Sequence, residues 1–218
     1  MKKFAVVLSG CGVFDGAEIH EAILTMLAIK KLGADYKIFA PDIDQHHVIN
    51  HYTGKEMKEK ERRNVLVESA RIARGNIQPL DEFEEKDFDA LIFPGGFGAA
   101  KNLSNVAFKG ADAEVDEEVE RAVKDMLTVK KPIGALCISP AVIAKIIGDV
   151  KVTIGQDEET AQAIEKMGGT HVTTDHGDVV VDDEKLIFTT PCYMLDAEIT
   201  DIWDGAYNIV DAMIKFME

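Results

Sequence analysis

The sequence predicts an α/β domain, with a mostly parallel β-sheet and helices on both of its faces, from three observations. Short apolar runs of strand length alternate with segments whose apolar residues recur at every third or fourth position, which is the pattern of βαβ units. The chain has 218 residues, of which 46% are hydrophobic, so it can bury one substantial core. It shows no linker, internal repeat or low-complexity tract, and we therefore expect residues 1–218 to form a single domain.

Six apolar runs have the length of strands. In chain order they are FAVVL at 4–8, YKIFA at 36–40, ALIF at 90–93, IGAL at 133–136, VVVD at 179–182 and LIFTT at 186–190. Only a short polar turn at 182–185 separates the last two runs, so we expect them to form an antiparallel hairpin added to the parallel core.

Three apolar stripes at helical spacing are expected to cover the faces of the sheet. The first comprises Ile19, Ile23, Met26 and Leu27, the second Val115, Val119, Ala122, Val123 and Met126, and the third, within 199–217, Ile202, Ala206, Ile209, Val210, Met213 and Ile214. A further helix is expected around 64–74. The segment before it, 41–63, has many charges and no clear period, which favours a surface insertion.

The charge balance argues against polyanionic partners. Lysine and arginine total 24, against 39 for aspartate and glutamate, which gives a net charge of -15. A protein that binds nucleic acid or an anionic membrane surface needs a basic face, so we expect neither partner.

The N-terminal stretch and the cysteines predict a cytoplasmic protein. The apolar run near the N-terminus breaks at Ser9, which is too early for a signal peptide or a membrane span. The three cysteines, Cys11, Cys137 and Cys192, are odd in number and lack CxxC spacing. This argues against a disulfide framework and a zinc ribbon, and it fits a reducing compartment.

Ligands of open α/β sheets gather beyond the carboxyl ends of the strands, and Cys137 directly follows the predicted strand 133–136. Because Ser139 is a suitable N-cap and Pro140 suits a first helical turn, Cys137 is predicted to lie on a sharp strand-to-helix turn of the nucleophile-elbow kind. The positive end of the helix is expected to lower the pKa of the thiol and to favour the thiolate. The alternative is that Cys137 is a small buried apolar residue.

The loop PGGFG at 94–98 follows another predicted strand. Gly95 and Gly96 allow backbone conformations in which amide N–H groups face a ligand oxygen. The loop lacks the GxxxxGK[ST] pattern of a phosphate loop. We therefore interpret it as part of an oxyanion hole, in which the amides of Gly96 and Ile138 share a developing negative oxygen. The alternative is a plain tight turn.

The first loop, at 9–22, supplies two carboxylates. Its glycines do not complete a dinucleotide fingerprint, because Asp15 stands where the third glycine is needed. Glu18 and Glu21 lie one turn apart at the start of a helix, and the helix dipole is sufficient to explain Glu18. Glu21 lies among apolar residues, so we expect its carboxyl to be desolvated and protonated, and to exchange protons with Cys137.

Several blocks of the sequence resemble a known group. GAEIHE at 16–21, PGGFGAAKNLS at 94–104 and the cysteine turn are similar to the PfpI-type superfamily within the class I glutamine amidotransferase-like fold. The similarity is greatest to its ElbB branch, known as enhancing lycopene biosynthesis protein or glyoxalase-like. It extends over nearly the whole chain, including RNVLVESARIARG at 63–75 and TTPCYML at 189–195.

The resemblance implies a flavodoxin-like three-layer sandwich, with Cys137 as the nucleophile, Glu21 as the neighbouring acid and Gly96 in the oxyanion pocket. It also implies a weak, glutathione-independent glyoxalase activity that turns glyoxal into glycolate, with a small-molecule dicarbonyl as the substrate. A homodimer is implied as well. We expect no cofactor and no metal ion.

One departure concerns a histidine that many relatives carry in the loop after the strand that follows the nucleophile helix. The best-matching positions here are Gly155 and Gln156, so no Cys-His pair is evident. Protease or amidase chemistry needs such a base and therefore loses support. His20 and His176 stay open as candidates for a contact with Cys137.

The remaining residues of interest are assigned lesser roles. Histidines and aspartates of the predicted insertion are Asp42, Asp44, His46, His47 and His51. They fit no ordered metal-ligand spacing, so we expect them to decorate the surface. Cys11 is expected to line the site, with a reversible disulfide as the alternative, and Cys192 is assigned no role.

The sequence therefore predicts a glyoxalase-like enzyme, in which the thiolate of Cys137 adds to an aldehyde and Glu21 relays a proton. A dicarbonyl requires less assistance than an amide, because no amine leaving group has to be protonated. Two alternatives stay open. One is a redox sensor or binding protein whose Cys137 is oxidised without turnover. The other is an amidotransferase-like or hydrolase-like accessory protein linked to isoprenoid biosynthesis.

Overall fold

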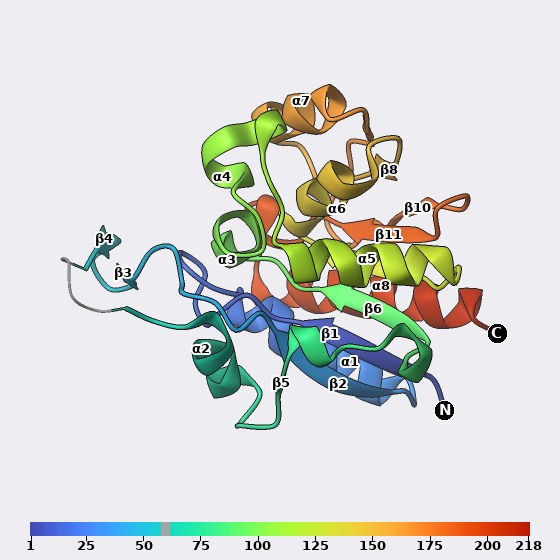
Figure 1. Ribbon diagram of the computed structural model, residues 1–218. Helices are drawn as coiled ribbons and strands as arrows, with labels where there is room; N and C mark the ends of the chain where they lie inside the picture. The colour runs from blue at the N-terminus through green and yellow to red at the C-terminus, as the bar shows by residue number, and fades with distance from the viewer. Residues whose placement is uncertain (58–61) are drawn as a thin grey trace.

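The alternating apolar runs form one seven-stranded sheet between two layers of helices, as a computed structural model that describes residues 1–57 and 62–218 shows (Figure 1). The strand order is β10-β11-β7-β6-β1-β2-β5. The strands are β1 Lys3–Val7, β2 Asp35–Ala40, β5 Gln78–Pro79, β6 Ala90–Phe93, β7 Ile133–Leu136, β10 Val180–Asp182 and β11 Ile187–Thr190. All neighbouring pairs are parallel except β10 and β11, which are antiparallel.

All six predicted strands are confirmed. The runs at 90–93 and 133–136 coincide with β6 and β7, and the other four agree with their strands to within one residue at each end. The predicted hairpin is confirmed as β10–β11. The sequence did not reveal β5, because it has only two residues and one of them is a proline, which an edge strand tolerates. The flavodoxin-like three-layer sandwich is therefore confirmed.

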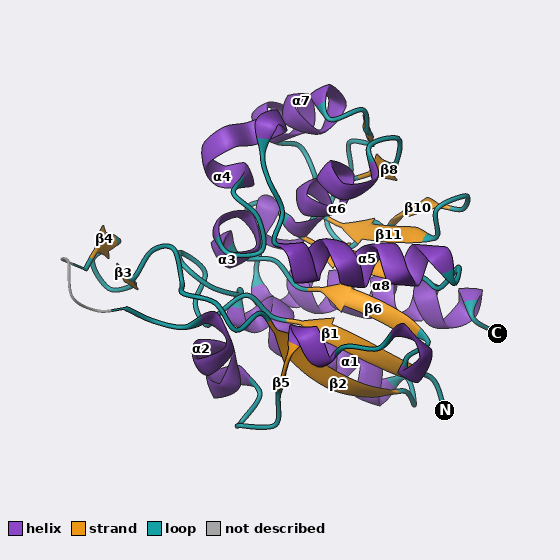
Figure 2. Ribbon diagram, viewed as in Figure 1, coloured by secondary structure: helices purple, strands orange, loops and turns teal. Residues whose placement is uncertain are grey.

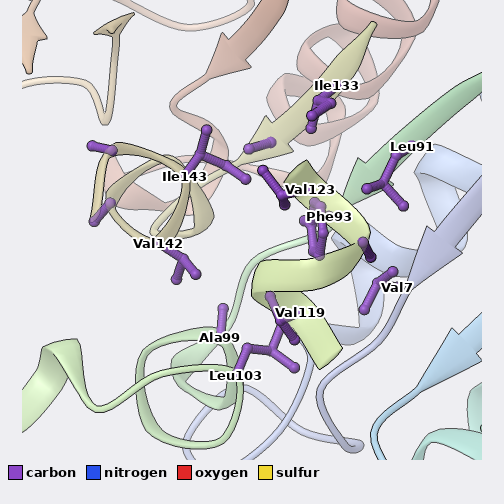
Figure 3. Packing of buried hydrophobic residues seen from close by; sticks show 14 of the residues in the cluster. Val7, Leu91, Phe93, Ala99, Leu103, Val119, Val123, Ile133, Val142 and Ile143 are labelled. Carbon is purple, nitrogen blue, oxygen red and sulfur yellow. The ribbon is translucent and has the colours of Figure 1, made fainter. Parts of the chain in front are cut away.

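Helices cover both faces of the sheet (Figure 2). They are α1 Ile19–Lys31, α2 Val65–Ile72, α3 Phe97–Lys101, α4 Val106–Lys109, α5 Glu117–Thr128, α6 Ser139–Ile147, α7 Glu158–Lys166 and α8 Ile199–Phe216. Because strand side chains alternate between faces, two cores result. Val7, Leu91 and Phe93 pack in the core that includes residues of α3, α5 and α6 (Figure 3), whereas Phe4 and Val6 pack with residues of α1 and α8.

The predicted apolar faces of α5 and α8 are confirmed, but of the four residues predicted for the apolar face of α1 only Met26 is buried. Ile19, Ile23 and Leu27 are 38%, 46% and 41% exposed. The buried face of α1 instead carries Met26 and Ile29 together with smaller residues and Glu21. The small residues allow α1 to approach the sheet and α8 closely, and this rotates the larger apolar stripe toward the outside.

The segment 41–63 is a surface insertion over its described residues, as predicted; residues 58–61 of it lie outside the described part. It contains a short hairpin of β3, Ile49–Asn50, and β4, Lys55–Glu56. The buried carboxylate of Asp15 accepts a hydrogen bond from the Ile49 amide at 2.6 Å and ties this hairpin to the first loop. Two further short strands, β8 Lys151–Val152 and β9 Thr170–His171, flank α7. Within the described residues, no helix has the length and apolarity of a membrane span.

Candidate active site

Cys137 lies on the predicted turn between β7 and α6. Its φ angle is +60°, a conformation that costs a non-glycine residue energy and is held here by the surrounding structure. The Cys137 amide donates to the Thr190 carbonyl at 3.0 Å, which anchors the turn to β11. The N-cap of α6 is Ile138 rather than the predicted Ser139. The Ser139 hydroxyl is used differently: it donates to the Pro94 carbonyl at 2.9 Å and so ties the turn to the glycine loop.

Glu21 reaches the same point from the first turn of α1. Its side chain is fully buried, and each carboxyl oxygen accepts a backbone hydrogen bond, from the Gly95 amide at 2.8 Å and from the Tyr193 amide at 3.3 Å. Burial, together with the nearby charge of Glu18, raises the pKa of Glu21 to about 8. The predicted burial of the carboxyl is confirmed, and the raised pKa agrees with the prediction that it retains its proton. Glu18 has the structural role expected of it, because its carboxylate caps α1 by accepting from the Glu21 amide at 2.7 Å.

Gly95 permits the contact between the thiol and the carboxyl. A Cβ atom at this position would lie 2.4 Å from the Cys137 Cβ, 2.9 Å from its Sγ and 2.7 Å from Glu21 Oε2. Real Cβ atoms do not approach other atoms so closely, so only glycine leaves room for the pair. The side chains of Glu21 and Cys137 are hydrogen-bonded to each other in the space that Gly95 leaves.

The two amides proposed for an oxyanion hole both interact with the sulfur. The backbone N–H groups of Gly96 and Ile138 donate to Cys137 and act to lower its pKa. Gly96 has a φ angle of +95°, and a Cβ there would lie 2.3 Å from the Glu18 amide nitrogen. The glycine is thus required both by its backbone conformation and by the close approach of the first loop.

The expected low pKa of the Cys137 thiol is wrong. Only 6% of the residue is exposed, and burial and the charge of Glu21 raise the pKa of the thiol well above its ordinary value. The Gly96 and Ile138 amides oppose this shift but do not outweigh it. At neutral pH the site therefore holds a proton on the sulfur and, in most molecules, another on Glu21.

A cavity of about 430 Å³ opens onto Cys137. Its lining includes Gly96 and Ile138, which carry the two amides, and the aromatic residues Phe97 and Tyr193. A larger hollow of about 520 Å³ lies over the start of α5, but no cysteine, serine or threonine of the described residues lines it. The cavity at Cys137 is therefore the candidate active site.

Neither candidate histidine contacts the thiol. Nδ1 of His20 is hydrogen-bonded to the Tyr193 hydroxyl at 2.8 Å, and His176 lies 4.0 Å from the carboxylate of Asp175. Neither histidine lines the cavity, and no other histidine of the described residues does so. Gln156, one of the positions matched to the histidine of relatives, donates its side-chain amide to the Thr174 carbonyl instead.

The other cysteines and the histidines of the insertion lie apart from the cavity. All three cysteines are free. Cys11 is half-buried but does not line the cavity, so the prediction that it does is wrong. Rings of His46 and Phe108 lie 4.4 Å apart between centroids. Among the residues with described positions, no group of three or more potential metal ligands gathers.

Sequence reasoning missed Tyr193, Asp157 and Thr160, which all contribute to the cavity wall. Tyr193 follows β11 in a short 3-10 turn, Cys192–Met194, and its contribution to Glu21 is a backbone amide. Asp157 caps α7 by accepting from the Thr160 amide at 2.8 Å. Tyr193 could have been found, because it lies in the loop after β11 and such loops form the site in this kind of sheet. Asp157 and Thr160 could not, because α7 follows the short strand β8, which the sequence did not reveal.

The fold and the site define a class of α/β proteins, in which a cysteine on a sharp turn after a central parallel strand faces a buried glutamic acid. The DJ-1/PfpI family matches residues 11–190. The chain belongs to this family, and it is an ElbB-like member of it, as the sequence motifs predicted.

The chain is also similar to two curated relatives and to two solved structures. It is 47% identical to the ES1 protein homolog, mitochondrial, of Rattus norvegicus, over 98% of this chain and 82% of that protein. It is 45% identical to the glutamine amidotransferase-like class 1 domain-containing protein 3, mitochondrial, of Homo sapiens, over 98% and 81%.

Among solved structures, an isoprenoid biosynthesis protein with amidotransferase-like domain from Ehrlichia chaffeensis has a TM-score of 0.93 at 39% identity, covering 100% of both chains. Glyoxalase III from Candida albicans has a TM-score of 0.63 at 16% identity, covering 98% of this chain and 96% of that one, which shows a shared fold alone.

Proposed function

We propose that the protein is a glyoxalase-like enzyme that converts glyoxal, or a related reactive dicarbonyl, into a hydroxy acid without glutathione or another cofactor. The observation that carries the proposal is the convergence of the Glu21 carboxyl and two backbone amides on the buried Cys137 sulfur, at a cavity that no histidine of the described residues lines. One proton shuttle and one oxyanion site are what an internal redox rearrangement of a dicarbonyl requires.

The reaction begins when the Cys137 sulfur attacks one aldehyde carbon. The thiol proton passes to the Glu21 carboxylate, a C–S bond forms, and the new alkoxide is held by the amides of Gly96 and Ile138 until it takes a proton and becomes a hemithioacetal. This step needs Glu21 in its ionised form. Because the pKa of Glu21 is about 8, the reactive form with a single proton in the pair becomes more populated as the pH rises toward 8.

The remaining steps move a proton between neighbouring carbons. Glu21 removes the proton from the carbon that bears sulfur, giving an enediol, and returns it to the adjacent carbon. The first carbon is now a thioester and the second an alcohol. Water then cleaves the C–S bond, which releases glycolate and restores the thiol. One carbon is oxidised and the other is reduced, so no external oxidant or reductant is consumed.

The proposal is tested by incubating the purified protein with glyoxal and following glycolate by NMR. Many glycolate molecules per protein chain, and none with Cys137→Ser, support it. Consumption of one glyoxal per chain, or turnover that survives the substitution, contradicts it.

The two alternatives are less well supported by the site. A redox sensor needs an exposed thiol of low pKa, whereas Cys137 is buried and its pKa is raised. An amidotransferase or hydrolase needs a base for the thiol and an acid for the amine, and no histidine of the described residues lines the cavity. Isoprenoid biosynthesis appears in the name of the similar Ehrlichia chaffeensis protein.

We also propose that the protein forms a homodimer through α1. The stripe of Ile19, Ile23 and Leu27 is exposed, and Ile199 on the neighbouring α8 is 52% exposed. Apolar side chains gathered on one layer favour contact with another protein surface. Ile23→Glu should convert a dimer to a monomer in light scattering, whereas Val67→Glu on α2, where the side chain is 61% exposed, should not. A dimer that survives Ile23→Glu would place the interface elsewhere.

For nucleic-acid and membrane partners and for the cellular location, we retain the proposals made from composition. The net charge of -15 supports the absence of nucleic-acid and anionic-membrane partners. A cytoplasmic location fits the three free cysteines, but the names of both curated relatives contain the word mitochondrial. Fractionation of cells that express the protein distinguishes the two compartments.

A further inference from the structure

The cavity at Cys137 has an acidic rim. Three carboxylates line it, those of Glu18, Asp157 and Glu159, and no lysine, arginine or histidine of the described residues does so. Glu18 and Asp157 are held in position because each caps the N-terminus of a helix, α1 and α7 respectively. Hydrogen bonds from Thr160 lower the pKa of Asp157, so its negative charge is present at neutral pH.

The field of this rim reaches the reacting groups. The charge of Glu18 is among the causes that raise the pKa of Glu21 and of Tyr193. The ammonium of Lys101 lies 5.0 Å from the ring centroid of Phe97, one of the residues that line the cavity. Lys101 itself does not line the cavity, and it donates a hydrogen bond to the Phe14 carbonyl at 3.0 Å. Among the described residues, the charged side chains that line the cavity are therefore all acidic.

The cavity is also much larger than a simple dicarbonyl. Glyoxal has four heavy atoms, whereas a volume of about 430 Å³ is in the range of pockets for much larger ligands. The additional space is bounded by Phe97, which is 48% exposed, and by Tyr193 and Met194. Aromatic faces beside carboxylates favour an ammonium or guanidinium group, which both attract.

We propose that the substrate of this site is a carbonyl compound that carries a cationic group, an ammonium or guanidinium, bound between the acidic rim and the aromatic wall while its carbonyl reaches Cys137. Anionic carbonyl compounds are excluded by the same charges. The identity of the reacting carbonyl rests on the proposed glyoxalase-like function. The charge selection does not, because it requires only that ligands reach the sulfur through this cavity.

The test measures access to the sulfur with three methanethiosulfonate probes that differ in charge: the trimethylammonioethyl cation, the neutral methyl compound and the sulfonatoethyl anion. Initial rates of modification of the unmodified full chain are followed by mass spectrometry of the Cys137 peptide. Each rate is divided by the rate of the same probe with a small free thiol, which removes intrinsic differences in reactivity.

The normalised preference for the cation over the anion should be about tenfold or more, since several carboxylates act on a ligand within one Debye length, and it should shrink at high salt. In Asp157→Asn combined with Glu159→Gln it should fall several-fold, with the N-cap retained because asparagine caps as well as aspartate. The matched control Asp183→Asn with Glu184→Gln, in the β10–β11 turn, removes the same charge far from the cavity and should leave the preference unchanged.

A normalised ratio near one, or a ratio that the rim substitutions do not change, overturns the inference. The outcome is separable from that of the glyoxal assay. A protein without turnover that still prefers the cationic probe refutes the proposed reaction and retains the charge selection. A protein that turns over glyoxal without a charge preference supports the proposed reaction and refutes the charge selection.

Discussion

Cys137 and Cys192 follow two neighbouring parallel strands, yet only one of them has the surroundings of a reactive group. They are 6% and 4% exposed, and their φ angles are +60° and +41°. Two amides and the Glu21 carboxyl meet the Cys137 sulfur, which also lines the cavity. The Cys192 sulfur instead packs beside Gly205, and burial and like charges raise its pKa without any hydrogen bond to oppose them. Burial and unusual backbone geometry are therefore not sufficient; the donors around the sulfur make the difference.

Exchange of each sulfur tests this comparison most strongly. Cys137→Ser should reduce the turnover of glyoxal by at least about a thousandfold, because the nucleophile is lost. Cys192→Ala should retain most of the activity, since its sulfur does not line the cavity. Steady-state glycolate formation measures both. Equal losses in the two variants would mean that the two cysteines are not distinguished as the structure indicates.

Removal of the carboxyl should have the next largest effect. Glu21→Gln should lower kcat by about a hundredfold to ten-thousandfold, the usual contribution of a general acid–base group. In the unmodified protein the rate should rise with pH and level off near pH 8, the pKa of Glu21, and the variant should lose this rise. A variant that kept the same pH profile would show that another group controls the reaction.

The buried carboxyl of Glu21 should also make the fold less stable at neutral pH than at acidic pH. The thiol of Cys192 should have no such effect over this pH range. The pKa of Glu21 rises from 4.5 to about 8 on folding, so between these values the unfolded chain has released a proton that the folded chain retains. The contribution of the protonated Glu21 carboxyl to the free energy of unfolding is therefore full below pH 4.5, and it is lost as the pH rises to 8.

The free energy of unfolding of the wild type, relative to Glu21→Gln, should thus fall by about 3 kcal/mol between pH 5 and pH 8. Urea unfolding at several pH values measures the difference, and Cys192→Ala should follow the wild type. A difference independent of pH would contradict the raised pKa.

The smallest effect concerns Gly96, whose amide donates to Cys137, whereas no donor of the glycine loop acts on Cys192. Gly96 and Gly148 have φ angles of +95° and +77°, so alanine should cost about 1 kcal/mol of stability at either site from backbone strain. A Cβ at Gly96 also lies 2.3 Å from the Glu18 amide, whereas at Gly148 the nearest atom is 3.6 Å away. Gly96→Ala should cost about 2 kcal/mol more than Gly148→Ala in urea unfolding. Equal costs for the two variants would show that the loop at Gly96 can shift enough to accommodate the added methyl group.

The position of each reactive residue in the chain was sufficient to locate most of the site. Cys137 and Gly96 follow strands whose apolar runs are unambiguous, and parallel strands bring such loops to one edge. Glu21 was recognised because apolar neighbours surround it in sequence. Tyr193 was missed because its backbone amide makes the contact, and every non-proline residue carries such a group.

Two errors have physical causes that sequence does not express. The apolar run at 133–136 is the same whether the sulfur of Cys137 faces solvent or lies beneath the loops. The positive end of α6 alone therefore does not determine the pKa of the thiol, because burial also acts on it. The apolar stripe of α1 is regular, but close packing favoured the face with alanines and Thr25, and Ile23 was turned outward. Periodicity locates an apolar face and does not show which surface covers it.

Both outer strands of the central sheet are poor templates for another chain. At one end, β5 is two residues long and contains Pro79, which has no N–H to offer. At the other, β10 is only three residues long, and Asp182 at its end accepts a hydrogen bond from the Lys151 amide at 2.8 Å. Pairing of sheet edges between molecules is thus disfavoured at both ends of the sheet, and with it amyloid-like stacking of the native fold.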